Sequence, residues 1–225
     1  YHYNHFEEEH GLIHIGMISH LGSMIPVAAG VALAFQQAGK DRVAINFIGE
    51  GATSTGDFHE GLNIASVWRL PFILVIENNQ WAFSTPTSQQ YACDRLVDRA
   101  IGYGIPGVQV DGNNPKAVLQ VMETAVARAR AGEGPTLIEA MLGRQRGHSE
   151  GDDSLTQVPA EELEQYHEND PLDLLEKELT DKGIASHAWI EEIRERCSAL
   201  IVKYVDEAMS LPEPEVGKHR SIYAE

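Results

Sequence analysis

The stretch VAINFIGEGATSTGDFHEGLNIASVWRLPFILVIENN, residues 43–79, decides the fold class of this chain. Val43–Ile48 and Pro71–Ile76 are short apolar runs, the pattern of strands that are buried on both faces. Between them, Ser54–Arg69 repeats apolar residues at helical spacing. A strand, a helix and a second strand with short joins predict a right-handed crossover between parallel strands.

The same alternation continues on both sides of this unit, and Ser54 and Asp57 have the spacing of a capping box at the start of its helix. We expect further helices at 22–38 and 116–131, and further strands at 108–110 and 136–141. The predicted fold is therefore α/β: a parallel sheet with helices on both faces, followed by a C-terminal helical extension.

The charge balance changes near residue 144 and divides the chain into regions. We expect an α/β domain at 1–143 that lacks an N-terminal part, since the sequence begins without Met. Residues 144–159 are polar and aperiodic, which indicates a loop. Residues 160–212 have helical periodicity at 160–168, 171–182 and 186–209, with Ser186 as a cap, and 213–225 resemble a linker or tail.

Composition excludes several classes of protein. The 225 residues carry 34 acidic against 17 basic side chains, a net charge of −17, which disfavours nucleic acid and anionic membrane surfaces as partners. No apolar run is long enough to span a bilayer. Cys93 and Cys197 are the two cysteines and have no metal-site spacing, which favours a reducing compartment.

Two polar groups follow the two strands of the central unit. Glu50 stands between Gly49 and Gly51 after the first strand, and Asn79 follows the second. Each group alone is typical of an ordinary turn. Because parallel strands end at one edge of the sheet, where such folds bind ligands, both side chains are expected there. Hard oxygen ligands next to a helix N-terminus favour Mg²⁺ together with a phosphate group.

These residues resemble a known motif, Gly-acid-Gly followed after a few dozen residues by Asn-Asn, of thiamine diphosphate enzymes. Four segments narrow the resemblance to the α subunit of 2-oxo acid dehydrogenases, the decarboxylating first component of those complexes: GEGATSTGDFHEGLNIASVW (49–68), VIENNQWAFSTPTSQQY (75–91), YGIPGVQVDGNN (103–114) and RQRGHSEGDDS (144–154). The motifs follow the family's order over about residues 14–212. Glu50 in place of Asp, and STPTSQQY, resemble branched-chain members.

The resemblance implies the cofactors thiamine diphosphate and Mg²⁺, and roles for individual residues. Glu50, the Asn79 side chain and the Trp81 backbone carbonyl are the implied metal ligands. The implied cofactor-binding residues are Ser19, Leu21, Gly49, Gly51, Ala52, Asn79 and His148. His148, on the 144–159 loop, is also the implied catalytic residue. Arg144 and Arg146 are either solvated charges or residues that order this loop or meet an anionic substrate.

The implied activity is oxidative decarboxylation of a branched-chain 2-oxo acid or pyruvate, with transfer of the acyl group to a lipoyl group. The implied partners are a β subunit or fused β part, a lipoyl acyltransferase core and the 2-oxo acid, in bacterial cytoplasm or the mitochondrial matrix. An acetoin dehydrogenase α subunit and a transketolase-like enzyme are alternatives. A third is a non-catalytic fragment that assembles with a β subunit. We expect the isolated chain to be inactive.

Overall fold

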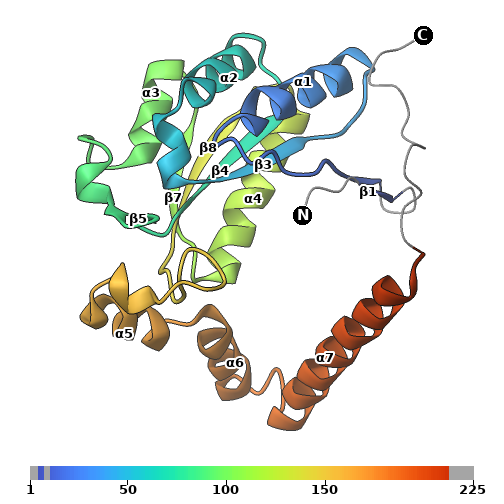
Figure 1. The fold of residues 1–225 in the computed structure, drawn as a ribbon. Helices are drawn as coiled ribbons and strands as arrows, with labels where there is room; N and C mark the ends of the chain where they lie inside the picture. Colours follow the sequence, from blue (N-terminus) through green and yellow to red (C-terminus); the bar gives the residue numbers. More distant parts are fainter. Residues whose placement is uncertain (1–4, 8–10, 213–225) are drawn as a thin grey trace. The chain divides into compact units, whose positions relative to one another are not determined.

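A computed structural model describes residues 5–7 and 11–212 (Figure 1). Within this part of the chain, four parallel strands form one sheet in the order β3-β4-β8-β7. The strands are β3 (Ala44–Gly49), β4 (Phe72–Asn78), β7 (Gly107–Asp111) and β8 (Thr136–Met141). The central strands β4 and β8 are buried along nearly their whole length, because both of their faces are covered. The prediction of a parallel α/β sheet is confirmed.

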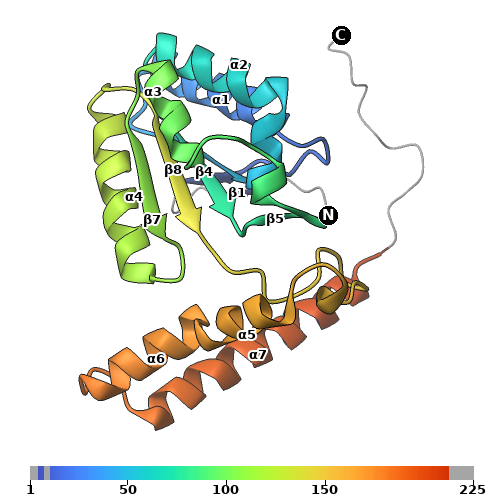
Figure 2. The same cartoon turned by 90° about the vertical axis from the view of Figure 1, so that its left-hand side faces the viewer.

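Helices cover both faces of the sheet, as predicted (Figures 1 and 2). On one face, α1 (Met24–Gln37) and α2 (Gly56–Val67) share a core with α3 (Ala100–Tyr103). Ala28, Ala29 and Ala32 are buried on α1, and such small side chains let a helix approach a sheet closely. The other face is covered by α4 (Pro115–Arg130), whose Ala125 packs with Val75 and Ile138.

The start of α2 differs from the expected capping box at Ser54. A 3₁₀ turn, η1 (Glu50–Ser54), precedes the helix, and Thr55 is its N-cap, accepting from the Phe58 N–H at 3.4 Å. Asp57 instead accepts a hydrogen bond from the Ser23 hydroxyl at 2.7 Å, which joins the starts of α1 and α2. The prediction was wrong because several hydroxyl residues in a row make the cap ambiguous by one position.

Short elements that the sequence pattern did not predict lie between the long ones. They are the antiparallel pair β1 (His5–Glu7) and β2 (Leu12–His14), the hairpin β5 (Trp81–Ala82) and β6 (Thr85–Pro86), and the 3₁₀ turns η2 (Thr87–Gln89), η3 (Leu96–Arg99) and η4 (Ser154–Thr156). Elements of two to four residues carry too little periodicity to be predicted.

The chain divides into two compact units, Tyr1–Asp173 and Leu174–Glu225. The first holds the sheet, the 144–159 segment and α5 (Ala160–Glu168), and the boundary falls inside α6 (Pro171–Asp181). The second holds α7 (His187–Ser210), which Ser186 caps as expected by accepting from the Trp189 N–H.

The predicted region boundaries at 143/144 and 159/160 remain predictions, and the predicted tail 213–225 lies outside the described residues. Of the helices that the structure describes, none has the length and apolar character that crossing a bilayer requires.

Candidate functional site

The carboxyl edge of the sheet brings together the two polar groups singled out by sequence. β3 and β4 pair in parallel with Gly49 opposite Glu77, so Glu50 and Asn79 leave their strands at the same edge. The Glu50 side chain is only 2% exposed. The Glu50 carboxylate accepts a hydrogen bond of 3.3 Å from the side-chain NH₂ group of Gln90. The side-chain oxygen of Gln90 is buried and has no hydrogen-bond partner. A buried carboxylate is costly unless cationic or polar groups compensate it, so this acid is not an ordinary turn residue.

Gly51 places the β5–β6 hairpin against the loop that carries Glu50. A Cβ atom built on Gly51 would lie 2.8 Å from the Ala82 Cβ, closer than real carbon atoms approach. The missing side chain at residue 51 therefore makes room for the hairpin. Ala82 directly follows Trp81, so this contact brings the expected backbone ligand to the Glu50 loop.

The turn that carries Trp81 is built from side chains of its own neighbours. The Asn78 and Asn79 amide oxygens each accept a hydrogen bond of 3.0 Å, from the backbone N–H groups of Gln80 and Trp81 respectively. The oxygen of Asn79 thus orders the turn as well as being the expected metal ligand. A carbonyl-type oxygen has two lone pairs, so the N–H contact leaves one available.

Arg144 is the residue through which the 144–159 segment reaches this turn. Arg144 is 8% exposed, and its guanidinium donates to the Trp81 carbonyl at 3.2 Å, to the Phe83 carbonyl at 2.6 Å and to the Gln157 side chain at 2.6 Å. Burial lowers the pKa of Arg144, while the negative charge of Glu50 opposes this shift. Of the roles that the sequence left open for Arg144, these contacts support the one in which it orders the loop.

His148 lies on the same segment and contacts the hairpin. Its exposed ring stands edge-on to the Phe83 ring, with centroids 5.2 Å apart. The next residue, Ser149, donates its backbone N–H to the Asp152 carboxylate at 2.7 Å. The expected catalytic histidine is therefore beside the turn of Trp81, on the solvent side.

The N-terminal segment with Ser19 and Leu21 runs past the η1 turn. Both side chains are exposed, Leu21 at 67%. Gly22 follows with a φ of +82°, and a Cβ there would lie 2.3 Å from the Thr55 hydroxyl oxygen and 3.5 Å from the Ala52 carbonyl. The absence of a side chain at Gly22 thus lets this segment pass close to η1, where Ala52 is buried. The sequence reasoning did not single out Gly22.

A buried network below the site was also missed. Glu139 is 1% exposed in the middle of β8, and its carboxylate accepts hydrogen bonds from the side-chain amides of Asn78 (2.8 Å) and Gln109 (3.2 Å) and from the Val97 N–H (3.0 Å). Val97 belongs to the η3 turn, and Arg99 at the end of the same turn donates to the Thr53 carbonyl in η1 at 2.6 Å. An acid within the otherwise apolar run of residues 136–141 was the available sequence signal.

The helix α5 adds a second carboxylate near the Trp81 turn. The Trp81 indole N–H donates to Glu162 Oε2 at 3.1 Å, and the Tyr166 hydroxyl donates to the same oxygen at 3.0 Å. Burial, together with Glu162, raises the pKa of Tyr166 to about 12. The phenol therefore keeps its proton, and with it this hydrogen bond, at neutral pH.

The donor set fits the metal that the sequence predicted. Among the described residues, no group of three or more His, Cys, Asp or Glu side chains gathers as a metal site. The expected set needs only one carboxylate, since its other members are the Asn79 amide and the Trp81 carbonyl. All three are hard oxygen donors, the type that Mg²⁺ prefers, with the remaining positions left for phosphate and water. The residues fit the ion, and their assignment as ligands remains a prediction.

The sequence of the chain also matches a known protein family. The family model of the dehydrogenase E1 component matches residues 2–217. The chain belongs to the dehydrogenase E1 component family. Membership of this family also supports thiamine diphosphate as the cofactor.

Curated relatives of this E1 chain are α subunits. It is 41% identical over 208 residues to "2-oxoisovalerate dehydrogenase subunit alpha" of Bacillus subtilis, covering 92% of this chain and 63% of the relative. It is 39% identical over 206 residues to "3-methyl-2-oxobutanoate dehydrogenase subunit alpha" of Mycobacterium tuberculosis, covering 91% and 56%. It is 43% identical over 189 residues to "Pyruvate dehydrogenase E1 component subunit alpha" of Staphylococcus aureus, covering 84% and 51%. The chain thus spans between half and two thirds of the length of these relatives.

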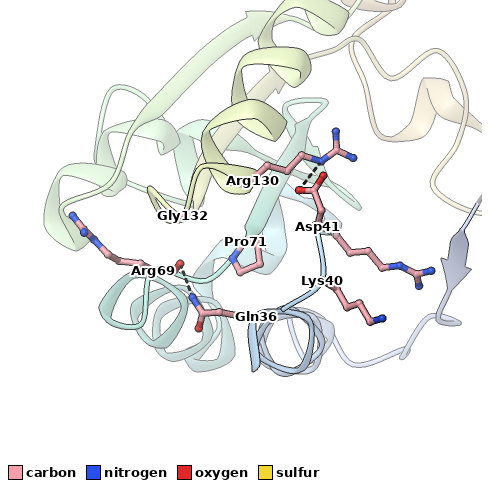
Figure 3. Close-up of a pocket in the computed structure, with 9 residues that line it drawn as sticks. Gln36, Lys40, Asp41, Arg69, Pro71, Arg130 and Gly132 are labelled. Carbon is pink, nitrogen blue, oxygen red and sulfur yellow. Dashed lines mark hydrogen bonds and ion pairs between the residues drawn. The ribbon is translucent and has the colours of Figure 1, made fainter. Parts of the chain in front are cut away.

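A hollow lies at the opposite edge of the sheet, where strands β3 and β4 begin (Figure 3). It lies where α1, α2 and α4 end, and its lining comprises Gln36, Lys40, Asp41, Arg42, Arg69, Pro71, Ala129, Arg130 and Gly132. Basic side chains complement the negative ends of helix dipoles. Arg130 faces Asp41 at 3.6 Å, whereas Lys40 and Arg69 extend away in different directions (Figure 3). Divergent cations at three helix ends do not converge on one ligand.

Proposed function

We propose that this chain is the α subunit, or the α part of a fused α–β chain, of a thiamine diphosphate-dependent 2-oxo acid dehydrogenase. The observation that carries the proposal is the buried carboxylate of Glu50 at the carboxyl edge of a parallel sheet, beside the turn of Asn79 and Trp81. The E1 family match supports it. The proposed reaction is oxidative decarboxylation of a 2-oxo acid followed by reductive acylation of a lipoyl group.

When bound, thiamine diphosphate supplies the carbon nucleophile and the electron sink for loss of carbon dioxide. The residues of this chain bind and orient it. Glu50, Asn79 and the Trp81 carbonyl would hold Mg²⁺, and the backbone at Gly49, Gly51 and Ala52 would face the diphosphate.

The remaining assigned residues would shape the entrance to the site. Ser19 and Leu21 would line the pocket from the segment before Gly22, which passes close to η1. His148 would approach the reacting carbon from the 144–159 segment, with its ring resting against Phe83. Arg144 keeps that segment joined to the Trp81 turn.

The substrate that we propose is a branched-chain 2-oxo acid, with pyruvate as the other candidate. Two of the three relatives above carry names of the branched-chain type and one is named for pyruvate. We also propose a β subunit or fused β part and a lipoyl acyltransferase core as partners, and bacterial cytoplasm as the location, because these relatives are bacterial.

Substrate profiling tests this function. The full-length protein, assembled with its β partner, is assayed for lipoyl acylation with 3-methyl-2-oxobutanoate, pyruvate and acetoin, and separately for ketol transfer from a sugar phosphate to an aldose phosphate. We expect turnover with 2-oxo acids, highest with the branched-chain compound, and none with residues 1–225 alone. Turnover confined to acetoin or to the sugar phosphate would replace the proposed reaction. Partner binding without Mg²⁺ or cofactor binding would point to a non-catalytic assembly fragment.

A further inference from the structure

The turn that presents the Trp81 carbonyl is conformationally strained. Gln80, before Trp81, and Phe83, after Ala82, have φ angles of +72° and +56°. Residues other than glycine seldom adopt this left-handed region. Such conformations are energetically unfavourable and persist only where the surroundings hold them. The direction of the Trp81 carbonyl therefore depends on contacts from outside the turn.

One of these contacts reaches the side chain of Trp81 from a different element. The indole N–H donates to Glu162 on α5 at 3.1 Å, across 81 positions of sequence. Two other hydrogen bonds of Trp81 involve its backbone: its N–H donates to the Asn79 side chain, and its carbonyl accepts from Arg144. Glu162 is thus the group that fixes the rotation of the Trp81 side chain.

Glu162 is itself held in place from its own helix. The Tyr166 hydroxyl, one helical turn away, donates to the same oxygen, Oε2, at 3.0 Å. The Tyr166 ring lies against Gly143, where an added Cβ would come within 2.3 Å of the ring. A carboxylate with two donors on one oxygen and a packed partner has little freedom, which makes it a fixed anchor rather than a solvated surface charge.

We propose that Glu162 is a positioning residue for the metal site: it anchors the Trp81 indole and so aims the Trp81 backbone carbonyl at Mg²⁺. Tyr166 fixes the anchor. The inference rests on the proposed function, since it concerns the same site. Glu162 acts through Trp81 and does not touch metal, cofactor or substrate. The charge of the carboxylate matters because an indole N–H bonds more strongly to a charged acceptor than to a neutral one.

The test uses the full-length protein with its β partner and the metal Mg²⁺ at saturating thiamine diphosphate. The variants are Glu162→Ala, Trp81→Phe, which removes the indole N–H, and the double variant. Glu161→Ala is the matched control, because Glu161 is an exposed acid on the same helix turn. Glu162→Gln retains a carbonyl oxygen as acceptor. Calorimetry gives Mg²⁺ affinity, and amide hydrogen exchange of residues 79–86 without metal reports the order of the turn.

We expect Glu162→Ala and Trp81→Phe each to weaken Mg²⁺ binding about three- to tenfold. Because the two groups act through one contact, the double variant should be no weaker than either single variant within about twofold. Glu162→Gln, which keeps only a neutral acceptor oxygen, should recover part of the affinity, and Glu161→Ala should not change it. Exchange of the 79–86 amides should rise in Glu162→Ala and not in Glu161→Ala.

Two results would overturn the inference. Normal Mg²⁺ affinity in Glu162→Ala, with a lowered unfolding temperature, would leave Glu162 a purely structural link between α5 and the hairpin while the proposed function stands. Additive losses in the double variant would also contradict it. Failure of the unmodified protein to bind Mg²⁺ and thiamine diphosphate would instead overturn the proposed function together with this inference.

Discussion

The guanidinium of Arg144 donates to the carbonyl oxygen of Trp81 at 3.2 Å, across 63 positions of sequence. This contact joins the segment that follows the last strand of the sheet to the turn that follows β4. The segment carries His148, and the turn carries the expected metal ligand. Order in one is therefore coupled to order in the other, through a single buried side chain.

Replacing Arg144 should loosen both parts. Arg144→Ala removes donors to two backbone carbonyls and to Gln157, and hydrogen bonds from charged groups are worth about 1.5–3 kcal/mol each when made in a folded protein. We expect proteolysis within residues 144–159 to become at least tenfold faster, measured by mass spectrometry of the fragments. Arg146→Ala, at an exposed position, is the control. Equal cleavage of the two variants would contradict the role assigned to Arg144.

Glu139 should be among the most sensitive positions for stability. Glu139→Ala leaves the buried Val97 N–H and the buried Asn78 amide without this acceptor, and unsatisfied buried groups cost about 1–3 kcal/mol each. We expect a loss of about 3 kcal/mol in the free energy of unfolding, measured in urea. Glu123→Ala, an exposed position on α4, should change it little. A loss below about 1 kcal/mol at Glu139 would show that the network does not hold the site.

Gly51→Ala tests the close approach of the hairpin. The added methyl group would meet Ala82 at 2.8 Å, and overpacking of this kind costs about 1–3 kcal/mol. Gly49→Ala is the control for stability, because no atom lies within 4 Å of its added Cβ and its backbone is extended. The double variant Gly51→Ala/Ala82→Gly removes the clash. The free energy of unfolding, measured in urea, should therefore be lower for Gly51→Ala than for the control or the double variant. Equal free energies for the three variants would refute the packing argument.

His59 predicts the direction of one pH dependence. Burial and, secondarily, the charge of Arg99 lower the pKa of His59 from its usual 6.5. In the unfolded chain this histidine takes up a proton at higher pH than in the folded chain. Its contribution to stability is therefore present above pH 6.5 and is lost as the pH falls through the lower folded value. The urea midpoint of unfolding should fall less between pH 7 and pH 5 in His59→Gln than in the unmodified protein. His187→Gln should show the same fall as the unmodified protein. A slope unchanged by His59→Gln would contradict this assignment.

The main strands and helices were predictable because each is long enough to show its period. Residues 136–141 and 160–168 coincide with β8 and α5, and Ser186 was recognisable as a cap. The β5–β6 hairpin was not predictable, because it has two residues in each strand and its turn contains left-handed Phe83 rather than a glycine.

For the candidate site, the sequence pattern located the residues that follow strands, because strand ends meet at one edge of a parallel sheet. It did not locate Gln90, Glu139 or Glu162, whose roles come from contacts between distant segments. A single acid on a helix with several acids carries no periodic signal. Of these three residues, Glu139 alone had a signal in the sequence that could have located it, since a charged residue inside an apolar strand must find partners when buried.

The most direct test of the central claim is a calorimetric titration of thiamine diphosphate with Mg²⁺ into the full-length protein assembled with its β partner. Glu50→Ala is compared with the unmodified protein and with Glu60→Ala, an exposed acid on α2. We predict Mg²⁺-dependent binding that persists in Glu60→Ala and is weakened at least a hundredfold in Glu50→Ala. Equal Mg²⁺-dependent binding by all three proteins would contradict the assignment of the buried carboxylate of Glu50 as the metal anchor.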